Sequence, residues 1–155
     1  QESASADIPN GYGLLNLGAR LKNKQLDAKT YGTIAKRMAE KGYPVVLTYG
    51  PSELELARQT QKFCQDAQIA PPTSLQELAG LMAKAAFTIS CDTGPMHIAA
   101  ATGKPVLGIF VSTPPLRYGY THGKNSVIDA RTEFKEAEIQ ELTSFIDALG
   151  SSPST

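Results

Sequence analysis

Cysteine, histidine and net charge are all scarce in this sequence, and each shortage excludes a class of protein. The two cysteines, Cys64 and Cys91, stand in a predicted helix and at a predicted strand end, so we expect reduced thiols rather than a disulfide framework. With only His97 and His122 beside them, no cluster has metal-ligand spacing, and a structural zinc site is excluded. A formal net charge of zero argues against a protein that binds nucleic acid through bulk positive charge.

Long hydrophobic runs are also missing. No apolar stretch approaches the length of a membrane span, and the N-terminus lacks the basic-then-apolar pattern of a secretion signal, so we expect a cytoplasmic protein. Hydrophobic residues nevertheless make up 41% of the 155 residues, which argues against a disordered chain. A chain of this length forms one domain that buries roughly 70% of its unfolded surface.

Short β-rich runs alternate with amphipathic segments of helical period along the chain. Strands are expected at 11–17, 44–49, 67–70 (weak, at an edge), 85–89, 105–111 and 126–128. Helices are expected at 27–42, 54–64, 75–85, 95–103 and 135–149. Leu54, Ala57, Phe63 and Cys64 are expected on or near the buried side of the second helix. This alternation predicts an α/β fold, a Rossmann-like three-layer α/β/α domain with a parallel sheet over residues 11–150. Residues 1–10 are interpreted as a linker or arm and 151–155 as a tail.

The most informative stretch is a strand followed by Asp92-Thr93-Gly94 and a helix whose first position is Pro95. The free backbone N–H groups at such a helix start suit an anion, and a phosphate best of all. Thr93 adds a hydroxyl, and His97 adds a donor in the first helical turn. An ordinary capped strand–helix joint remains the alternative.

Three further loops follow predicted strands and are expected at the same edge of the sheet, where ligands gather in such folds. Residues 18–24 hold three basic side chains beside a glycine and could approach a phosphate, although a solvated loop is the commoner meaning. Glu53 could take a ribose hydroxyl pair, or it could simply cap the helix that it starts and favour the helix dipole, and the sequence alone favours capping. Residues 112–120 form the last of these loops.

The signature Asp-Thr-Gly-x-x-His-x-Ala-Ala stands complete at 92–100. Together with residues 73–79 it resembles the donor-binding half of the heptosyltransferase family, the ADP-heptose-dependent glycosyltransferases of lipopolysaccharide core synthesis. Residues 50–53 are similar to the Gly-x-x-Glu nucleotide loop of that family. Residues 16–20 with Lys24 resemble its early Asn-Pro-Gly-Ala segment and the lysine that follows, so the resemblance covers about residues 12–123.

The resemblance implies a role for each matching residue. Thr93 and Gly94 would hold the donor diphosphate with His97 beside it, and Lys24 would neutralise charge on the departing nucleotide. The remaining donor contacts would come from Gly18 and Ala19 in the early segment, Glu53 at the ribose, Thr73 near the adenine and Asp92 facing the sugar. Neither a metal nor a cofactor is implied.

Two departures from the family pattern leave the donor sugar open. Leu26-Asp27 stands where a Trp-Pro is usual, and Val111-Ser112-Thr113-Pro114 replaces Gly-Pro-Thr and the Asp expected after it. The Ser112–Tyr120 loop that begins there would lie near the donor sugar or the cleft.

Enzymes of this family have two Rossmann-like domains in the GT-B arrangement, and this chain resembles the C-terminal one. The general base and the site for a lipopolysaccharide-type acceptor would lie in a missing N-terminal domain, so the chain alone should be inactive. Without that N-terminal domain, the apolar surface between the two domains should be exposed on this chain, around residues 112–120 and 135–149. Peripheral membrane association, at the inner face of the inner membrane, would concern the full enzyme only.

Two other functions remain open on the sequence. One is a stand-alone nucleotide-binding module without catalysis. The other, a nicotinamide-dependent oxidoreductase domain, ranks lower because no G-x-G-x-x-G follows the first strand.

Overall fold

The computed structural model describes residues 11–17, 26–50, 53–70, 74–91, 94–110, 126–129 and 135–150, which contain six parallel strands and five helices. A helix follows every strand except β5, after which β6 is the next described element. The strands are β1 Gly13–Asn16, β2 Val45–Thr48, β3 Gln68–Ile69, β4 Phe87–Cys91, β5 Val106–Phe110 and β6 Ser126–Asp129. The helices are α1 Ala28–Glu40, α2 Leu54–Phe63, α3 Leu75–Lys84, α4 Gly94–Ala101 and α5 Glu136–Gly150.

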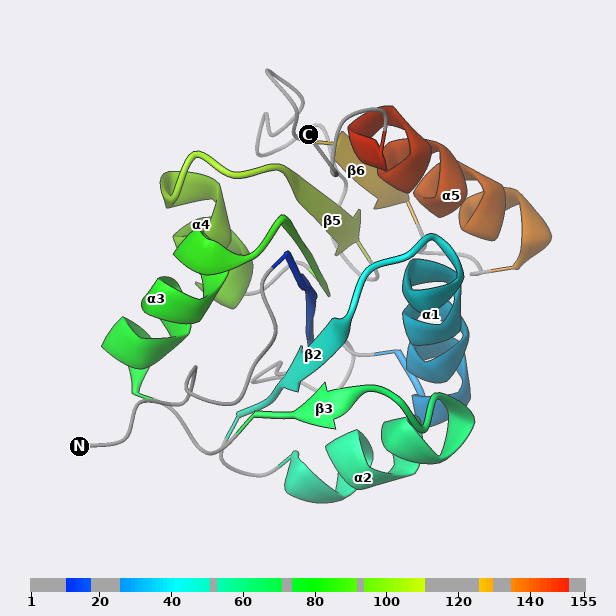
Figure 1. Ribbon diagram of the computed structural model, residues 1–155, viewed down its shortest axis with the longest axis horizontal. Coiled ribbons are helices and arrows are strands. Elements are labelled where there is room, and N and C mark those ends of the chain that lie inside the picture. Colours follow the sequence, from blue (N-terminus) through cyan, green and yellow to red (C-terminus); the bar gives the residue numbers. More distant parts are fainter. Residues whose placement is uncertain are drawn as a thin grey trace.

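The strands form one sheet in the order β3-β2-β1-β4-β5-β6, and every pair is parallel (Figure 1). This arrangement confirms the predicted Rossmann-like α/β domain. The weak strand predicted at 67–70 is present as β3, and it does lie at an edge of the sheet.

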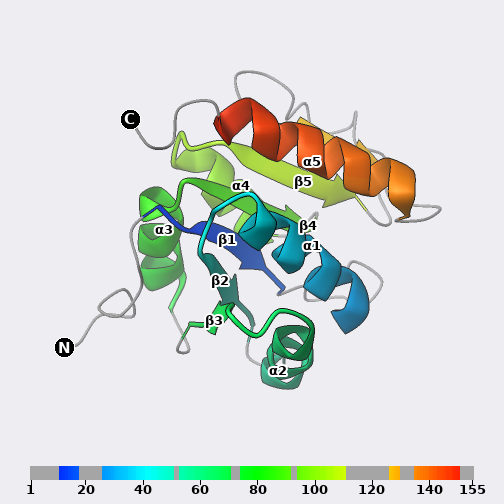
Figure 2. The ribbon, with the colours of Figure 1, turned by 45° about the vertical axis from the view of Figure 1, so that its right-hand side comes forward.

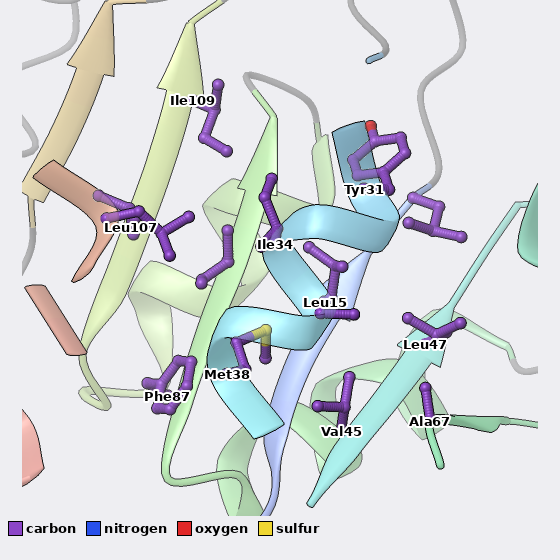
Figure 3. Close-up of a cluster of buried hydrophobic side chains, with 14 of the residues drawn as sticks. Leu15, Tyr31, Ile34, Met38, Val45, Leu47, Ala67, Phe87, Leu107 and Ile109 are labelled. Carbon is purple, nitrogen blue, oxygen red and sulfur yellow. The ribbon is translucent and has the colours of Figure 1, made fainter. Parts of the chain in front are cut away.

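Helices cover both faces of the sheet, with α1, α2 and α5 on one side and α3 and α4 on the other (Figures 1 and 2). Successive residues of a strand point to opposite faces, so each strand contributes to two separate cores. The larger core, under α1, holds Leu15, Phe87 and Ile109 (Figure 3). The smaller core, under α3 and α4, holds Leu14 and Val46.

Local signals in the sequence fix several of the helix ends. Asp27 caps α1 by accepting a hydrogen bond from the backbone N–H of Thr30 at 2.8 Å. Ser74 and Glu77 form a reciprocal capping box at the start of α3. Gly103 follows α4 with a φ of 82°, a conformation that glycine adopts without steric cost.

Two expectations about apolar side chains were wrong. Phe63, expected on the buried side of α2, is 45% exposed. The apolar face of α5, expected to remain open, is instead packed into the larger core through Leu142, Phe145 and Ile146. The 112–120 part of that prediction lies outside the described residues.

The described helices include none that is both long and apolar enough to cross a membrane. Both cysteines are reduced thiols and buried, Cys64 after α2 and Cys91 at the end of β4. Burial raises the pKa of the Cys64 thiol.

Candidate functional site

The strand order reverses between β1 and β4. The chain builds outward from β1 through β2 to β3, then returns to the other side of β1 and continues through β4, β5 and β6. Connections leaving the carboxyl ends of β1 and β4 therefore diverge to opposite sides, and ligands of open α/β sheets bind in the crevice at such a point. Asn16 and Ser90 are register partners on these two strands.

The predicted strand–turn–helix joint lies on one side of this point. β4 ends at Cys91 and α4 begins at Gly94, one residue before Pro95, which the sequence analysis placed at the first helical position. Asp92 and Thr93, between the two elements, lie outside the described residues. His97 belongs to the first turn of α4, but its side chain is likewise outside the description.

The connection after β1 lies on the other side of the reversal. Leu17 extends this strand with a backbone hydrogen bond to the Thr48 carbonyl at 2.8 Å. Gly18, Ala19 and Lys24 lie in the segment 18–25, outside the described residues, and so does Thr73 before α3.

Glu53 is the one predicted donor-contacting residue whose side chain is described. Its carboxylate does not cap α2. Instead, Oε1 accepts a hydrogen bond from the backbone N–H of Gly50 at 3.0 Å, and the Glu53 N–H donates to the Gly50 carbonyl at 3.1 Å. The half-buried Glu53 thus closes the turn that follows β2, which corrects the interpretation of this carboxylate as a helix cap.

Tyr31 contributes a contact that the sequence analysis missed. Its hydroxyl lies 3.4 Å from the Cys91 Sγ and accepts a hydrogen bond from the backbone N–H of Leu26 at 3.3 Å. Figure 3 shows Tyr31 at the end of the core toward which the arrows of β4 and β5 point. Burial, followed by the neighbouring Cys91, raises the pKa of Tyr31 well above its usual value, so the hydroxyl stays protonated. Its position in an apolar helical face made it indistinguishable from an ordinary core residue.

Thr48, Asn16 and Ser90 form a second group near the strand ends, and all three side chains are at most 2% exposed. Their only signal in the sequence is that each strand becomes polar at its last or next-to-last residue. Among the described residues, no three His, Cys, Asp or Glu side chains gather to hold a metal ion.

Comparison with known proteins gives the family. The family model described as "Glycosyltransferase family 9 (heptosyltransferase)" matches residues 1–146. This chain belongs to glycosyltransferase family 9. The resemblance inferred from the signature at 92–100 is thereby confirmed.

Individual relatives agree with that assignment. Lipopolysaccharide heptosyltransferase 1 of Pseudomonas aeruginosa is 31% identical over 130 residues, which cover 82% of this chain and 36% of the relative. The chain therefore spans about a third of the length of the curated family-9 relatives that it matches.

Solved structures of the family share the fold. The Escherichia coli ADP-heptose lipopolysaccharide heptosyltransferase II superposes with a TM-score of 0.77 at 22% identity, covering 92% of this chain and 47% of that one. The structure titled "E. coli heptosyltransferase WaaC with ADP" gives a TM-score of 0.75 at 20% identity, covering 91% of this chain and 46% of that one. At these identities the likeness shows the fold alone.

Proposed function

We propose that this chain is the C-terminal, donor-binding domain of an inverting family-9 glycosyltransferase that uses a nucleotide-diphosphate sugar, ADP-heptose, to build lipopolysaccharide core. The observation that carries the proposal is the reversal of strand order between β1 and β4, in a chain that belongs to this family. The family signature begins directly after β4, beside that reversal, where ligands of this fold class bind.

The charge that develops during glycosyl transfer explains the proposed roles. As the bond from the sugar to the diphosphate breaks, negative charge grows on the departing ADP. Preorganised N–H groups and a cation directed at that charge lower the barrier most. The N–H groups at the start of α4, with the Thr93 hydroxyl and His97, would hold the diphosphate. Lys24 would neutralise the leaving group.

The remaining predicted contacts would orient the donor. Gly18 and Ala19 would bind beside the diphosphate, Thr73 would lie near the adenine, and Asp92 would face the sugar. Glu53 would accept hydrogen bonds from the ribose hydroxyls. Its closed turn supports this role, because one carboxylate oxygen is already fixed by Gly50 and the carboxylate need not be ordered by the ligand.

The other half of the reaction needs a second domain. We propose that the general base and the lipopolysaccharide-type acceptor site belong to an N-terminal domain, and that any membrane association, at the inner face of the inner membrane, concerns the complete enzyme. The isolated chain should bind donor without transferring heptose.

Isothermal titration of the 155-residue chain with ADP, UDP, GDP, ADP-heptose and adenosine tests this function. We expect ADP and ADP-heptose to bind more tightly than UDP, GDP or adenosine. A folded chain that binds none of the nucleoside diphosphates would contradict donor binding. Turnover of ADP-heptose by the chain alone would contradict the assignment of the base to another domain.

A stand-alone nucleotide-binding module would give the same titration result. The two functions differ in the parent reading frame, where an acceptor-binding domain encoded upstream supports the enzyme.

A further inference from the structure

A row of polar side chains crosses the centre of the sheet at one register level. Asn16 on β1 pairs with Thr48 on β2 and with Ser90 on β4. The residues two positions earlier on β1 and β2 are Leu14 and Val46, which belong to the core under α3 and α4. Because strand residues two apart share a face, this face of the sheet changes from apolar to polar near the strand ends.

The row forms a directional chain of hydrogen bonds. The Thr48 hydroxyl donates to Asn16 Oδ1 at 2.9 Å, and Asn16 Nδ2 donates to Ser90 Oγ at 3.3 Å. The Ser90 hydroxyl then donates to the carbonyl of Cys91 at 3.0 Å. Three strands are thus linked through side chains, and the link ends on the last residue of β4.

Cys91 is also held from the opposite face of the sheet. Its Sγ contacts the Tyr31 hydroxyl, which in turn accepts the backbone N–H of Leu26. Leu26 is the first described residue after the segment 18–25, and Cys91 is the last before 92–93. The Tyr31 hydroxyl therefore links Leu26, which precedes α1, to Cys91, the last residue of β4.

The stability of the fold does not by itself require a row of buried polar side chains at this place. Replacing both partners of a buried hydrogen bond by apolar groups of the same shape can be neutral or stabilising. Buried polar networks, in contrast, rigidify and specify one arrangement of the elements that they join. Here the joined elements are the three strands whose following loops carry the proposed donor contacts.

We propose that Thr48, Asn16 and Ser90 are positioning residues for the donor diphosphate. The row of hydrogen bonds fixes the position of the end of β4 relative to β1 and β2. It thereby fixes the position of the N–H groups at the start of α4. This inference rests on the proposed function, because it names how the same site is held.

Thr88 supplies a matched control. It lies on β4 two residues before Ser90 and on the same face, and it is 1% exposed. Its Oγ1 has no hydrogen-bond partner among the described residues. Thr48→Val and Thr88→Val are therefore the same chemical change on adjacent parts of one face of the sheet. Only Thr48→Val removes a hydrogen bond of the polar row.

The first measurement is titration of the 155-residue chain and its variants with ADP and adenosine, at a temperature where all remain folded. We expect Thr48→Val and Ser90→Ala to weaken ADP binding about fivefold, the factor that corresponds to one hydrogen bond, and to leave adenosine binding unchanged. Thr88→Val should leave both affinities unchanged, and Thr48→Ser, which keeps the hydroxyl, should restore ADP binding. Equal losses for both ligands, or the same effect from Thr88→Val, would overturn the proposal.

Hydrogen exchange without ligand keeps this result separate from the function itself. Amides at the start of α4 should exchange faster in Thr48→Val than in the unaltered chain, whereas Thr88→Val should not change them. If the unaltered chain does not bind ADP, the proposed function fails, and exchange still decides whether the row positions α4. If ADP binds and no variant differs in affinity or exchange, the function stands and the positioning role is wrong.

Discussion

Gly32 of α1 lies against Phe63 of α2 so closely that a methyl group added at Gly32 would overlap the Phe63 Cβ and stand 2.9 Å from its Cγ. The backbones of the two helices can approach this closely because Gly32 has no side chain. Phe63 is exposed yet still fixes the distance between the helices, because its first side-chain atoms rather than its ring tip make the contact.

The Gly32→Ala substitution should therefore destabilise the domain by about 1–3 kcal/mol, since α1 and α2 must move apart. Gly80→Ala in α3 is the matched control, because an added methyl there would lie within 4 Å of no described residue beyond its chain neighbours and the nearby backbone of its own helix. That change should stabilise the domain by about 0.5–1 kcal/mol through helix propensity alone. Urea unfolding measures both, and a neutral Gly32→Ala would show that the helices adjust freely.

Asp27 should make the start of α1 sensitive to acid. Hydrogen bonding to Thr30 lowers the pKa of this carboxyl below its ordinary value, so the folded state favours the charged form. Its contribution is present above the unfolded pKa, near 4, and is lost as the pH falls through the lower folded value.

Asp27→Ala should cost about 1 kcal/mol at neutral pH, as expected for a lost helix cap. Asp27→Asn keeps an acceptor for the Thr30 N–H and should cost less, while removing this part of the acid dependence. Unfolding measured between pH 3 and 7 checks both, and an acid limb that is unchanged in Asp27→Asn would contradict the assignment.

Tyr12 should make the stability of the fold depend on pH in the alkaline range. Burial raises its pKa to about 12, and its hydroxyl donates to the Leu81 carbonyl. An unfolded tyrosine ionises near pH 10, so above that value the folded chain retains a proton that the unfolded chain loses. Stability should accordingly fall as the pH rises from 10 to 12.

The Tyr12→Phe variant isolates this effect. It should be about 1 kcal/mol less stable at pH 7, through the lost hydrogen bond, and should show a shallower alkaline decline. Thermal melts between pH 8 and 12 provide the measurement. Parallel declines in the two proteins would assign the alkaline limb to other groups.

Substitutions of Lys24 and Thr93 should weaken the binding of a nucleoside diphosphate and leave the binding of the nucleoside unchanged. Lys24→Ala should weaken ADP binding by about 1.5–3 kcal/mol, because it removes a contact between opposite charges. Thr93→Val should cost about 1 kcal/mol. Adenosine affinity should not change in either variant, and unaltered ADP affinity in folded variants would rule out the phosphate site.

Glu53 should affect both the nucleotide and the fold. Glu53→Ala should weaken ADP and adenosine alike, because the ribose is common to both, and should cost about 1 kcal/mol of stability by freeing the Gly50 N–H. Glu53→Gln retains an acceptor for Gly50 and should recover most of the stability. Glu55→Ala, which removes an exposed carboxylate from the same helical turn, should leave ligand affinity unchanged. A ligand effect of equal size in Glu55→Ala would assign the loss to net charge.

The sequence by itself determined the number, type and order of the elements. Helical period placed Tyr31, Ile34 and Met38 on one buried face, and caps such as Asp27 and Ser74 fixed where helices begin. These signals are local, since a helix or strand period and a capping hydrogen bond involve residues within a few positions of one another. The family could also be identified from the sequence, because its signature at 92–100 is a contiguous motif.

Only the tertiary structure decided which elements are neighbours and what each polar side chain contacts. β1 pairs with β4 although Asn16 and its register partner Ser90 are 74 positions apart in the sequence, and that pairing creates the strand-order reversal beside the proposed site. The hydrogen bonds of Asn16 with Thr48 and Ser90 depend on the register of three strands, and the turn closed by Glu53 depends on the path of the backbone after β2. Phe63, expected on the buried side of its helix, is instead 45% exposed, and its first side-chain atoms lie against Gly32 of α1. Such contacts are set by the packing of the whole chain, which no short window of sequence contains.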